Sequence, residues 1–397
     1  MRAGLLAPFV ILSAACFSPT VEEGAECTPE GDCPPGQTCA DDGRCYASAP
    51  SFHFSRTIDI HPRSLTDVVR DFPLAIALAG DDGLIAHARD DGSDIHFTEA
   101  DGTTELAFEI ESFDRAQGDM VAWVNVPVLS LEDAIVMQYG AEPVEHPPAS
   151  ATWNERYLAV WHGQSAEDPA LLADSTGNGN DGHSDAGETP ARVAGQIGPA
   201  LSFDGVDDQV QIDEAVPLVV LDREADLLVT MWVRVSDMGG DNDLGTAIGK
   251  GTQSGTTAGF GFQMGKDNWT VRLRGSFTGG DTMAAVFGDS AALSGRWVLL
   301  GAAITHGEGG QETFEVAASV DATDTASGYW LCQTGPCGLD LGGPLYLGHP
   351  DAPFQGLVDE VRIVDRIAGP EDLGAELENL SDPDSFYTVG PEETLPR

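Results

Sequence analysis

The chain has 397 residues, enough for two substantial domains, and its hydrophobic content of 42% supplies the apolar surface that folded cores need. Acidic residues outnumber basic ones by 65 to 19, which gives a formal net charge of −46. Such a surface repels phosphate backbones and anionic headgroups, so we expect no nucleic-acid binding. It also attracts divalent cations, although a solvated acidic surface without specific metal sites is the commoner explanation.

The first residues are typical of an export signal. Arg2 precedes an apolar stretch, residues 5–15, that is too short to span a bilayer. The motif Ser13-Ala14-Ala15-Cys16 resembles a lipobox, which implies removal of residues 1–15 and lipidation of Cys16. Lipoboxes usually carry Leu where this chain has Ser13, so ordinary secretory cleavage is the alternative. We expect a lipoprotein of the outer membrane or cell surface, with a secreted protein as the second possibility.

Six cysteines remain beyond Cys16, and an even set in an exported chain predicts disulfides. Four of them recur at regular spacing within residues 16–50, among turn-forming Pro, Gly and Asp residues that offer little to bury. A zinc knuckle is the alternative, but the segment lacks a Cys-x-x-Cys pair and a His. The segment resembles the short Cys-rich spacers that follow the anchor of bacterial surface lipoproteins. The predicted disulfide residues, whose pairing stays open, are Cys27, Cys33, Cys39, Cys45, Cys332 and Cys337.

Residues 51–140 alternate short apolar runs with Gly, Asp and Pro, which predicts an antiparallel β-sandwich. The segments DGSDIHF, EIES and MQYG within it resemble a bacterial domain of unknown function, DUF2341, that often precedes jelly rolls. That resemblance implies no activity. A Pro-rich linker, residues 141–152, follows this domain.

Residues 153–390 contain many strand-like runs and one predicted helix that begins at Pro370, with residues 391–397 as a tail. The stretch GQIGPALSFDGVDDQVQI predicts a β-hairpin, because Leu201 and Phe203 alternate with polar residues, as do Val210 and Ile212, around a DGVDD turn. In GLVDEVRIVDR, the two-residue period puts Glu360 and Arg362 on one strand face and Asp359 on the other. Both stretches resemble the laminin-G-like, concanavalin-A-like jelly-roll family. The fold class is therefore all-β, with two sandwiches after a small disulfide-rich segment.

Relatives of this fold include glycosidases, which act through two carboxyl groups, so pairs of acidic residues are candidate catalytic residues. The best match, Glu109 and Glu111, lies in the upstream domain, and adjacent Asp359 and Glu360 should face opposite ways. A polar sheet face is the alternative for Glu109 and Glu111. The nine His residues are scattered, and none forms a metal pair at helical spacing.

Calcium is the ligand with a plausible mechanism. The loop DSTGNGNDG offers side-chain oxygens at alternating positions with intervening glycines, as in loops that collect hard cations. The resemblance to calcium-binding relatives implies two further ligands, Asp204 in the predicted hairpin and Asp359 in the strand GLVDEVRIVDR. An Asx-rich turn that satisfies its own backbone is the alternative. The predicted structural calcium ligands are Asp174, Asn178, Asn180, Asp204 and Asp359.

Two strands supply a candidate ligand surface. Alternation puts Val229, Met231 and Val233 toward the core and leaves Trp232 and Arg234 on the other face, with Arg272 and Arg274 outside on a later strand. An aromatic ring stacks on sugars and Arg pairs with carboxylates, so this face predicts an acidic glycan ligand. The alternative is that Trp232 is buried and the arginines pair with nearby acids.

These features together predict a non-enzymatic binding or adhesion protein of the cell surface, whose lectin-like jelly roll recognises a glycan or an envelope protein. A purely structural envelope protein and a glycoside hydrolase are the alternatives. The lipid anchor is the only membrane attachment that we expect.

Overall fold

The computed structural model comprises two compact units, Met1–Ser51 and Phe52–Arg397. It describes residues 28, 37–39, 44–47, 52–163, 168–212, 227–235, 245–251, 259–264, 268–274, 282–289, 295–306, 313–321, 323–331, 344–365 and 370–395. In the first unit, β1 (Gln37–Cys39) pairs antiparallel with β2 (Cys45–Ala47), so Cys39 lies opposite Cys45 in the ladder. No helix of the described residues is both long and apolar enough to span a bilayer.

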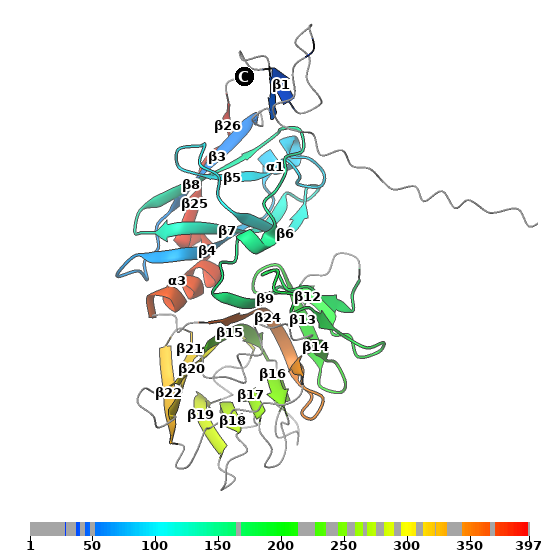
Figure 1. Ribbon diagram of the computed structural model, residues 1–397, viewed down its shortest axis with the longest axis vertical. Helices are drawn as coiled ribbons and strands as arrows, with labels where there is room; N and C mark the ends of the chain where they lie inside the picture. The colour runs from blue at the N-terminus through cyan, green and yellow to red at the C-terminus, as the bar shows by residue number, and fades with distance from the viewer. Residues whose placement is uncertain are drawn as a thin grey trace, which may run out of the picture. The chain divides into compact units, whose positions relative to one another are not determined.

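The second unit begins with a β-sandwich of two sheets (Figure 1). Sheet 1 has the order β25 (Tyr387–Val389), β3 (Phe54–Ile60), β8 (Asp133–Tyr139), β5 (His96–Glu99), with β26 (Glu393–Thr394) also beside β3. Sheet 2 has the order β4 (Val69–Leu78), β7 (Asp119–Leu129), β6 (Phe108–Asp114). The short helices α1 (Asp82–His87) and η1 (Ala149–Ala151) lie in the connections. The core between the sheets is built from the even positions of β7, including Met120, Ala122 and Val124.

The C-terminal segment completes this first sandwich. The predicted helix is present as α3 (Pro370–Ser381), is followed by α4 (Pro383–Phe386), and leads into β25 and β26 beside β3. The Asn379 side chain accepts a hydrogen bond from the Ala75 amide and donates one to the Ala75 carbonyl. The Tyr387 hydroxyl accepts a hydrogen bond from the Ala77 amide. Edge strand β4 is thereby capped. The jelly roll was predicted to run to residue 390, but β25 within that range and β26 beyond it both belong to the upstream sandwich.

The remaining strands form the jelly roll. Sheet 3 has the order β12 (Ala191–Ala194), β13 (Pro199–Asp204), β24 (Gln355–Val364), β15 (Leu227–Arg234), β20 (Trp297–His306), β21 (Thr313–Val320), β22 (Thr323–Leu331), with β9 (Tyr157–Trp161) also beside β24. Sheet 4 has the order β10 (Leu171–Leu172), β11 (Gly182–His183), β14 (Val210–Ile212), β23 (Leu345–Leu347), β16 (Gly245–Gly251), β17 (Gly259–Met264), β18 (Asn268–Arg274), β19 (Thr282–Asp289).

The predicted hairpin around DGVDD is wrong, although both of its strands exist. β13 pairs with β12 and β24 in sheet 3, whereas β14 pairs with β11 and β23 in sheet 4. The DGVDD turn therefore crosses from one sheet to the other. Phe203 and Val210 are both buried, so the two strands face the same core from opposite sides. Alternation alone cannot distinguish this crossing from a hairpin, because either arrangement buries one face of each strand.

Sheet 2 and sheet 3 also pack against each other (Figure 1). The odd positions Val121 and Trp123 of β7 join one buried cluster with Leu228 and Trp232 of β15. Val364 of β24 belongs to the same cluster. The face of sheet 3 that points away from the jelly-roll core is consequently covered by the first sandwich. The two sandwiches thus share a second hydrophobic core.

Candidate functional site

Charged side chains are buried within this second core. Glu109 and Glu111 lie on β6, His162 directly follows β9, and Glu360 lies on β24. The side chains of Glu111 and Glu360 are fully buried, and that of His162 is 1% exposed. We call these four residues the buried charge cluster. Burial of this extent requires partners for each charge.

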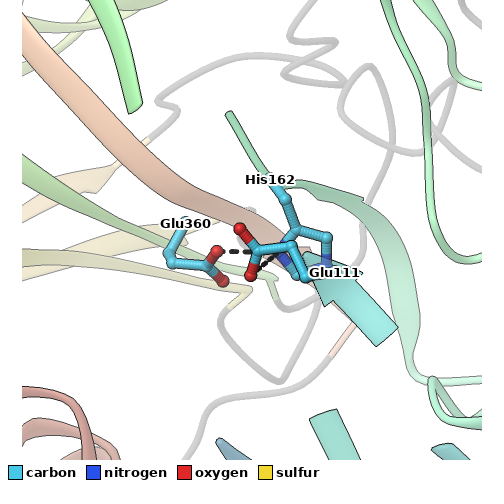
Figure 2. A group of neighbouring side chains, drawn as sticks. All are labelled: Glu111, His162 and Glu360. Carbon is cyan, nitrogen blue, oxygen red and sulfur yellow. Dashed lines mark hydrogen bonds and ion pairs between the residues drawn. The ribbon is translucent and has the colours of Figure 1, made fainter. Parts of the chain in front are cut away.

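His162 interacts with Glu111 and Glu360, which are drawn with it in Figure 2. Its Nδ1 is 2.7 Å from Oε1 of Glu360 and 3.8 Å from Oε2 of Glu111. Its Nε2 lies 3.5 Å from Oε2 of Glu109, an ion-pair distance at which Nε2 makes no hydrogen bond. The imidazole therefore contacts carboxylates of both sandwiches.

Indole and guanidinium groups donate hydrogen bonds to the three carboxylates of the cluster. Trp123 Nε1 donates to Oε2 of Glu111 at 2.9 Å, and Trp153 Nε1 donates to Oε2 of Glu109 at 2.8 Å. Arg362 donates to Oε2 of Glu360 at 3.0 Å, and its guanidinium carbon lies 4.6 Å from the centre of the Trp123 ring. Arg362 thus combines an ion pair with a cation–π contact.

The cluster shifts the proton affinities of its members. Burial raises the pKa of Glu111 well above its usual value, and the negative charges of Glu360 and Asp359 add to that effect. Burial alone would lower the pKa of His162, but the carboxylates of Glu360 and Glu109 raise it well above its usual value. Burial likewise opposes ionisation of Glu109, yet the His162 charge and hydrogen bonds hold the pKa of Glu109 below normal. His162 is therefore cationic at neutral pH, and Glu109 is its anionic partner.

Asp359 extends the cluster, contrary to the prediction that it faces away from Glu360. Both residues are buried, at 1% and 0% exposure. Glu360 has a φ of 49°, and the β15–β24 register shifts beside it. This β-bulge breaks the two-residue alternation. Burial raises the pKa of Asp359 well above its usual value, and the Glu360 charge adds to the effect.

The predicted calcium loop forms an internally satisfied turn. Both carboxylate oxygens of Asp174 accept from the Thr176 hydroxyl, and they also bind the amides of Val160, Thr176 and Asn180. The side-chain amides of Asn178 and Asn180 donate to the Leu158 carbonyl. These bonds match the Asx-rich alternative, in which the loop satisfies its own backbone.

The other two predicted calcium ligands do not converge on one ion. Asp204 pairs with Gln355 in the ladder, four residues from Asp359 along β24, which corresponds to roughly 13 Å. Asp359 Oδ2 accepts from the amides of Gln196 and Ile197, whereas Asp204 Oδ1 accepts from the Val206 amide. The single shared site predicted for Asp204 and Asp359 is therefore wrong.

The predicted ligand face is also wrong where it depends on Trp232. Trp232 is 2% exposed and belongs to the core shared by the two sandwiches. The period-two pattern of β15 is correct, but the outward face is covered by sheet 2 rather than by solvent. Arg234 is exposed at the strand end, and Arg272 and Arg274 lie on β18 of sheet 4, not beside Trp232 in sheet 3.

Sheet 4 instead presents a polar and aromatic row. His183, Gln211 and Tyr346 are aligned across β11, β14 and β23, and the Tyr346 hydroxyl donates to Gln211 Oε1 at 3.1 Å. His183 and Gln211 are exposed and Tyr346 is half-buried. The register continues through Gly249 and Gly261 to Arg272, although Gly249 itself is covered. We call His183, Gln211 and Tyr346 the sheet 4 row.

Several predicted residues lie outside the described part of the chain: Cys16, Cys27, Cys33, Cys332 and Cys337. Lipidation and disulfide formation therefore stay predictions. Sequence reasoning dismissed His162 as one of several scattered histidines. The sequence contained one weak indication that His162 is buried. This residue directly follows the apolar strand β9, a position where a solvated polar residue is not expected.

Family comparisons agree with this architecture. Residues 204–374 match the model of the Concanavalin A-like lectin/glucanases superfamily, and residues 91–152 match the Domain of unknown function DUF2341. The chain thus carries a DUF2341 region followed by a concanavalin-A-like jelly roll, in the order predicted from sequence. No curated protein matched the chain.

The solved structures to which this chain is similar include binding domains of toxins. The receptor binding domain of botulinum neurotoxin C/D mosaic serotype is 12% identical, with a TM-score of 0.44 over 57% of this chain and 51% of that chain. The botulinum neurotoxin serotype D ligand binding domain, solved with N-acetylneuraminic acid, is 14% identical, with a TM-score of 0.44 over 58% and 52%. The binding domain of Paraclostridial Mosquitocidal Protein 1 is 10% identical, with a TM-score of 0.43 over 57% and 52%. The chain spans about half the length of these chains.

Proposed function

We propose that this chain is a non-catalytic binding protein whose jelly roll recognises carbohydrate through the sheet 4 row. The observation that carries the proposal is an accessible aromatic and amide pair, Tyr346 and Gln211, on the outer sheet of a concanavalin-A-like domain. A half-buried tyrosine offers a ring face to a sugar, while its hydroxyl is fixed by a neighbour. Gln211 and His183 add hydrogen-bonding groups suited to sugar hydroxyls.

The charges around this row favour a neutral glycan. Partial burial raises the pKa of Tyr346, and the negative charges of Asp351 and Glu188 add to that effect. Two carboxylates close enough to act on the phenol would repel an anionic sugar. This expectation replaces the acidic glycan predicted from the arginines. Arg272 occupies the same register row, but two strands separate it from Tyr346.

The buried charge cluster supports a non-catalytic role. A glycosidase needs two carboxyl groups that reach the glycosidic bond from either side. Glu111 and Glu360 are fully buried, and Glu109 is 8% exposed with its oxygens bonded to Trp153 and Ser175. These carboxylates serve the packing of two sandwiches rather than an open cleft.

Export belongs to the same proposal. A binding module of this kind acts on extracellular ligands, so we propose that the chain is exported, as a surface lipoprotein through Cys16 or as a secreted protein. Calcium binding also stays a proposal that the same screen can test.

A glycan array probed with the purified chain, with and without Ca²⁺, tests the proposed function. We expect retention of neutral oligosaccharides and little retention of sialylated or sulfated ones. Glycan binding that requires Ca²⁺ would support a calcium site at the Asp174 loop. An absence of binding to every glycan class, with the chain folded by circular dichroism, would contradict the proposal.

A further inference from the structure

The buried charge cluster carries more negative charge than its cations can offset. Its carboxylates, with two neighbours included, are Glu109, Glu111, Asp359, Glu360 and Glu376, and its cationic side chains are His162 and Arg362. Uncompensated charge in a dry interior is costly. Either protons or a bound cation must supply the balance.

The geometry of three side chains suits a cation. Glu111, His162 and Glu360 each offer one ligand atom, and these atoms lie within 4.8 Å of one another (Figure 2). Oε1 of Glu111 has no hydrogen-bond partner although the side chain is fully buried. Gly198 has a positive φ, and a Cβ there would meet Oε1 of Glu111, so the glycine lets the backbone approach this carboxylate closely.

We propose that Glu111, His162 and Glu360 form a binding site for a divalent first-row transition cation such as Zn²⁺. One imidazole nitrogen and two carboxylates are a ligand set that Zn²⁺ accepts in three protein positions. Calcium takes six to eight oxygen ligands, so this set disfavours it. The site is distinct from the Asp174 loop and independent of glycan binding on sheet 4.

Neighbouring groups would orient the ligands. Glu109 lies 3.5 Å from Nε2 of His162 and is itself fixed by Trp153 and Ser175. In the metal-free chain the cationic His162 directs its Nδ1 proton to Glu360, so a bound cation would displace that proton and leave the Nε2 proton directed to Glu109. Carboxylates commonly fix metal-bound imidazoles in this way. Trp123 donates to Oε2 of Glu111, and Arg362 donates to Oε2 of Glu360.

A pocket lies beside the cluster, on the side of Glu109 and His162. It has a volume of about 270 Å³ and is lined by Glu109, His162 and residues of the Asp174 loop. Because Glu111 lies on β6 of the first sandwich and Glu360 on β24 of the second, a shared cation would join the two sandwiches. The site would therefore contribute to holding sheet 2 against sheet 3.

Metal binding to the full chain is tested after removal of metal with a chelator. Zinc is titrated by calorimetry, and bound zinc is counted by mass spectrometry, in wild type, Glu111→Gln, Glu360→Gln and the control Asp208→Asn. Asp208 is half-buried and belongs to a separate acidic group with the exposed Asp204 and Asp207. Cobalt spectra distinguish this site from thiolate sites made by cysteines.

We expect one Zn²⁺ per wild-type chain, with affinity lowered at least a hundredfold in both glutamine variants and unchanged in Asp208→Asn. The cobalt complex should lack a thiolate charge-transfer band. Absence of stoichiometric binding, equal binding by Glu111→Gln, or a thiolate band on the single bound ion would overturn the proposal. If Glu360→Gln does not fold, Glu111→Gln alone decides the outcome.

Discussion

Replacement of Glu111 by Gln should stabilise the metal-free chain at alkaline pH. The pKa of this carboxyl is raised by burial and by Glu360 and Asp359, so the folded chain retains a proton that the unfolded chain has released. Stability therefore falls as pH rises above the unfolded value of 4.5, by about 1.4 kcal/mol per pH unit until the folded pKa is reached. Glutamine is neutral throughout and retains an oxygen for Trp123.

The assay is thermal unfolding of chelator-treated protein between pH 5 and pH 9. At pH 8 the variant should be more stable than wild type, by about 1 kcal/mol for each unit by which burial has raised the pKa of Glu111, and it should melt at a higher temperature. Its stability should also fall less steeply with pH than that of wild type. Exposed Glu132 supplies the control, Glu132→Gln, for which no change is expected. A loss of stability in Glu111→Gln that is equal at pH 5 and pH 8 would refute the reasoning, because it would mean an ionised and stabilising carboxylate.

Further substitutions test other contacts. Trp232→Ala should cost about 3–5 kcal/mol in the free energy of unfolding, because it removes a ring that is 2% exposed from the core between the sandwiches; a change below 1 kcal/mol by thermal or chemical denaturation would contradict that burial. Arg362→Met should lower the free energy of unfolding by about 3–5 kcal/mol, because it leaves Glu360 and Glu376 without the cation that they share. Arg362→Lys should recover only part of this loss. An unchanged melting temperature of Arg362→Met would argue against the ion pairs. Glu392→Gln should lower stability near pH 7 and have less effect near pH 3. Burial raises the pKa of Glu392, but hydrogen bonds from Tyr139 and His87 outweigh burial and keep this pKa below normal. An equal effect of the substitution at both pH values would contradict a hydrogen-bonded, ionised Glu392.

Much of the fold follows from local patterns. Alternation located β13, β14, β15 and β24, and Pro370 marked the start of α3. These features depend on residues close in sequence, which determine strand and helix tendencies. The pairing of β13 and β14 with different sheets depends on contacts more than 100 residues away, so the hairpin prediction failed.

The functional surfaces were harder to predict because they depend on what covers a strand. Trp232 stood on the predicted face, but sheet 2 of the upstream sandwich buries that face. Glu109 and Glu111 were recognised as a carboxylate pair, yet only the tertiary fold brings them to His162 and Glu360. Asp359 joined the group because a bulge at Glu360 broke the regular alternation, and no pattern in GLVDEVRIVDR signals that bulge.

The proposed location of the binding surface is tested most directly by calorimetric titration of a neutral oligosaccharide retained on the array. Three proteins are compared: wild type, Tyr346→Ala and Trp232→Phe, the last of which keeps an aromatic ring in the buried core. We predict that Tyr346→Ala weakens affinity about tenfold or more, equivalent to about 1.4 kcal/mol, while Trp232→Phe binds as wild type. Unchanged affinity in Tyr346→Ala together with loss of binding in Trp232→Phe would contradict the assignment of the ligand to sheet 4.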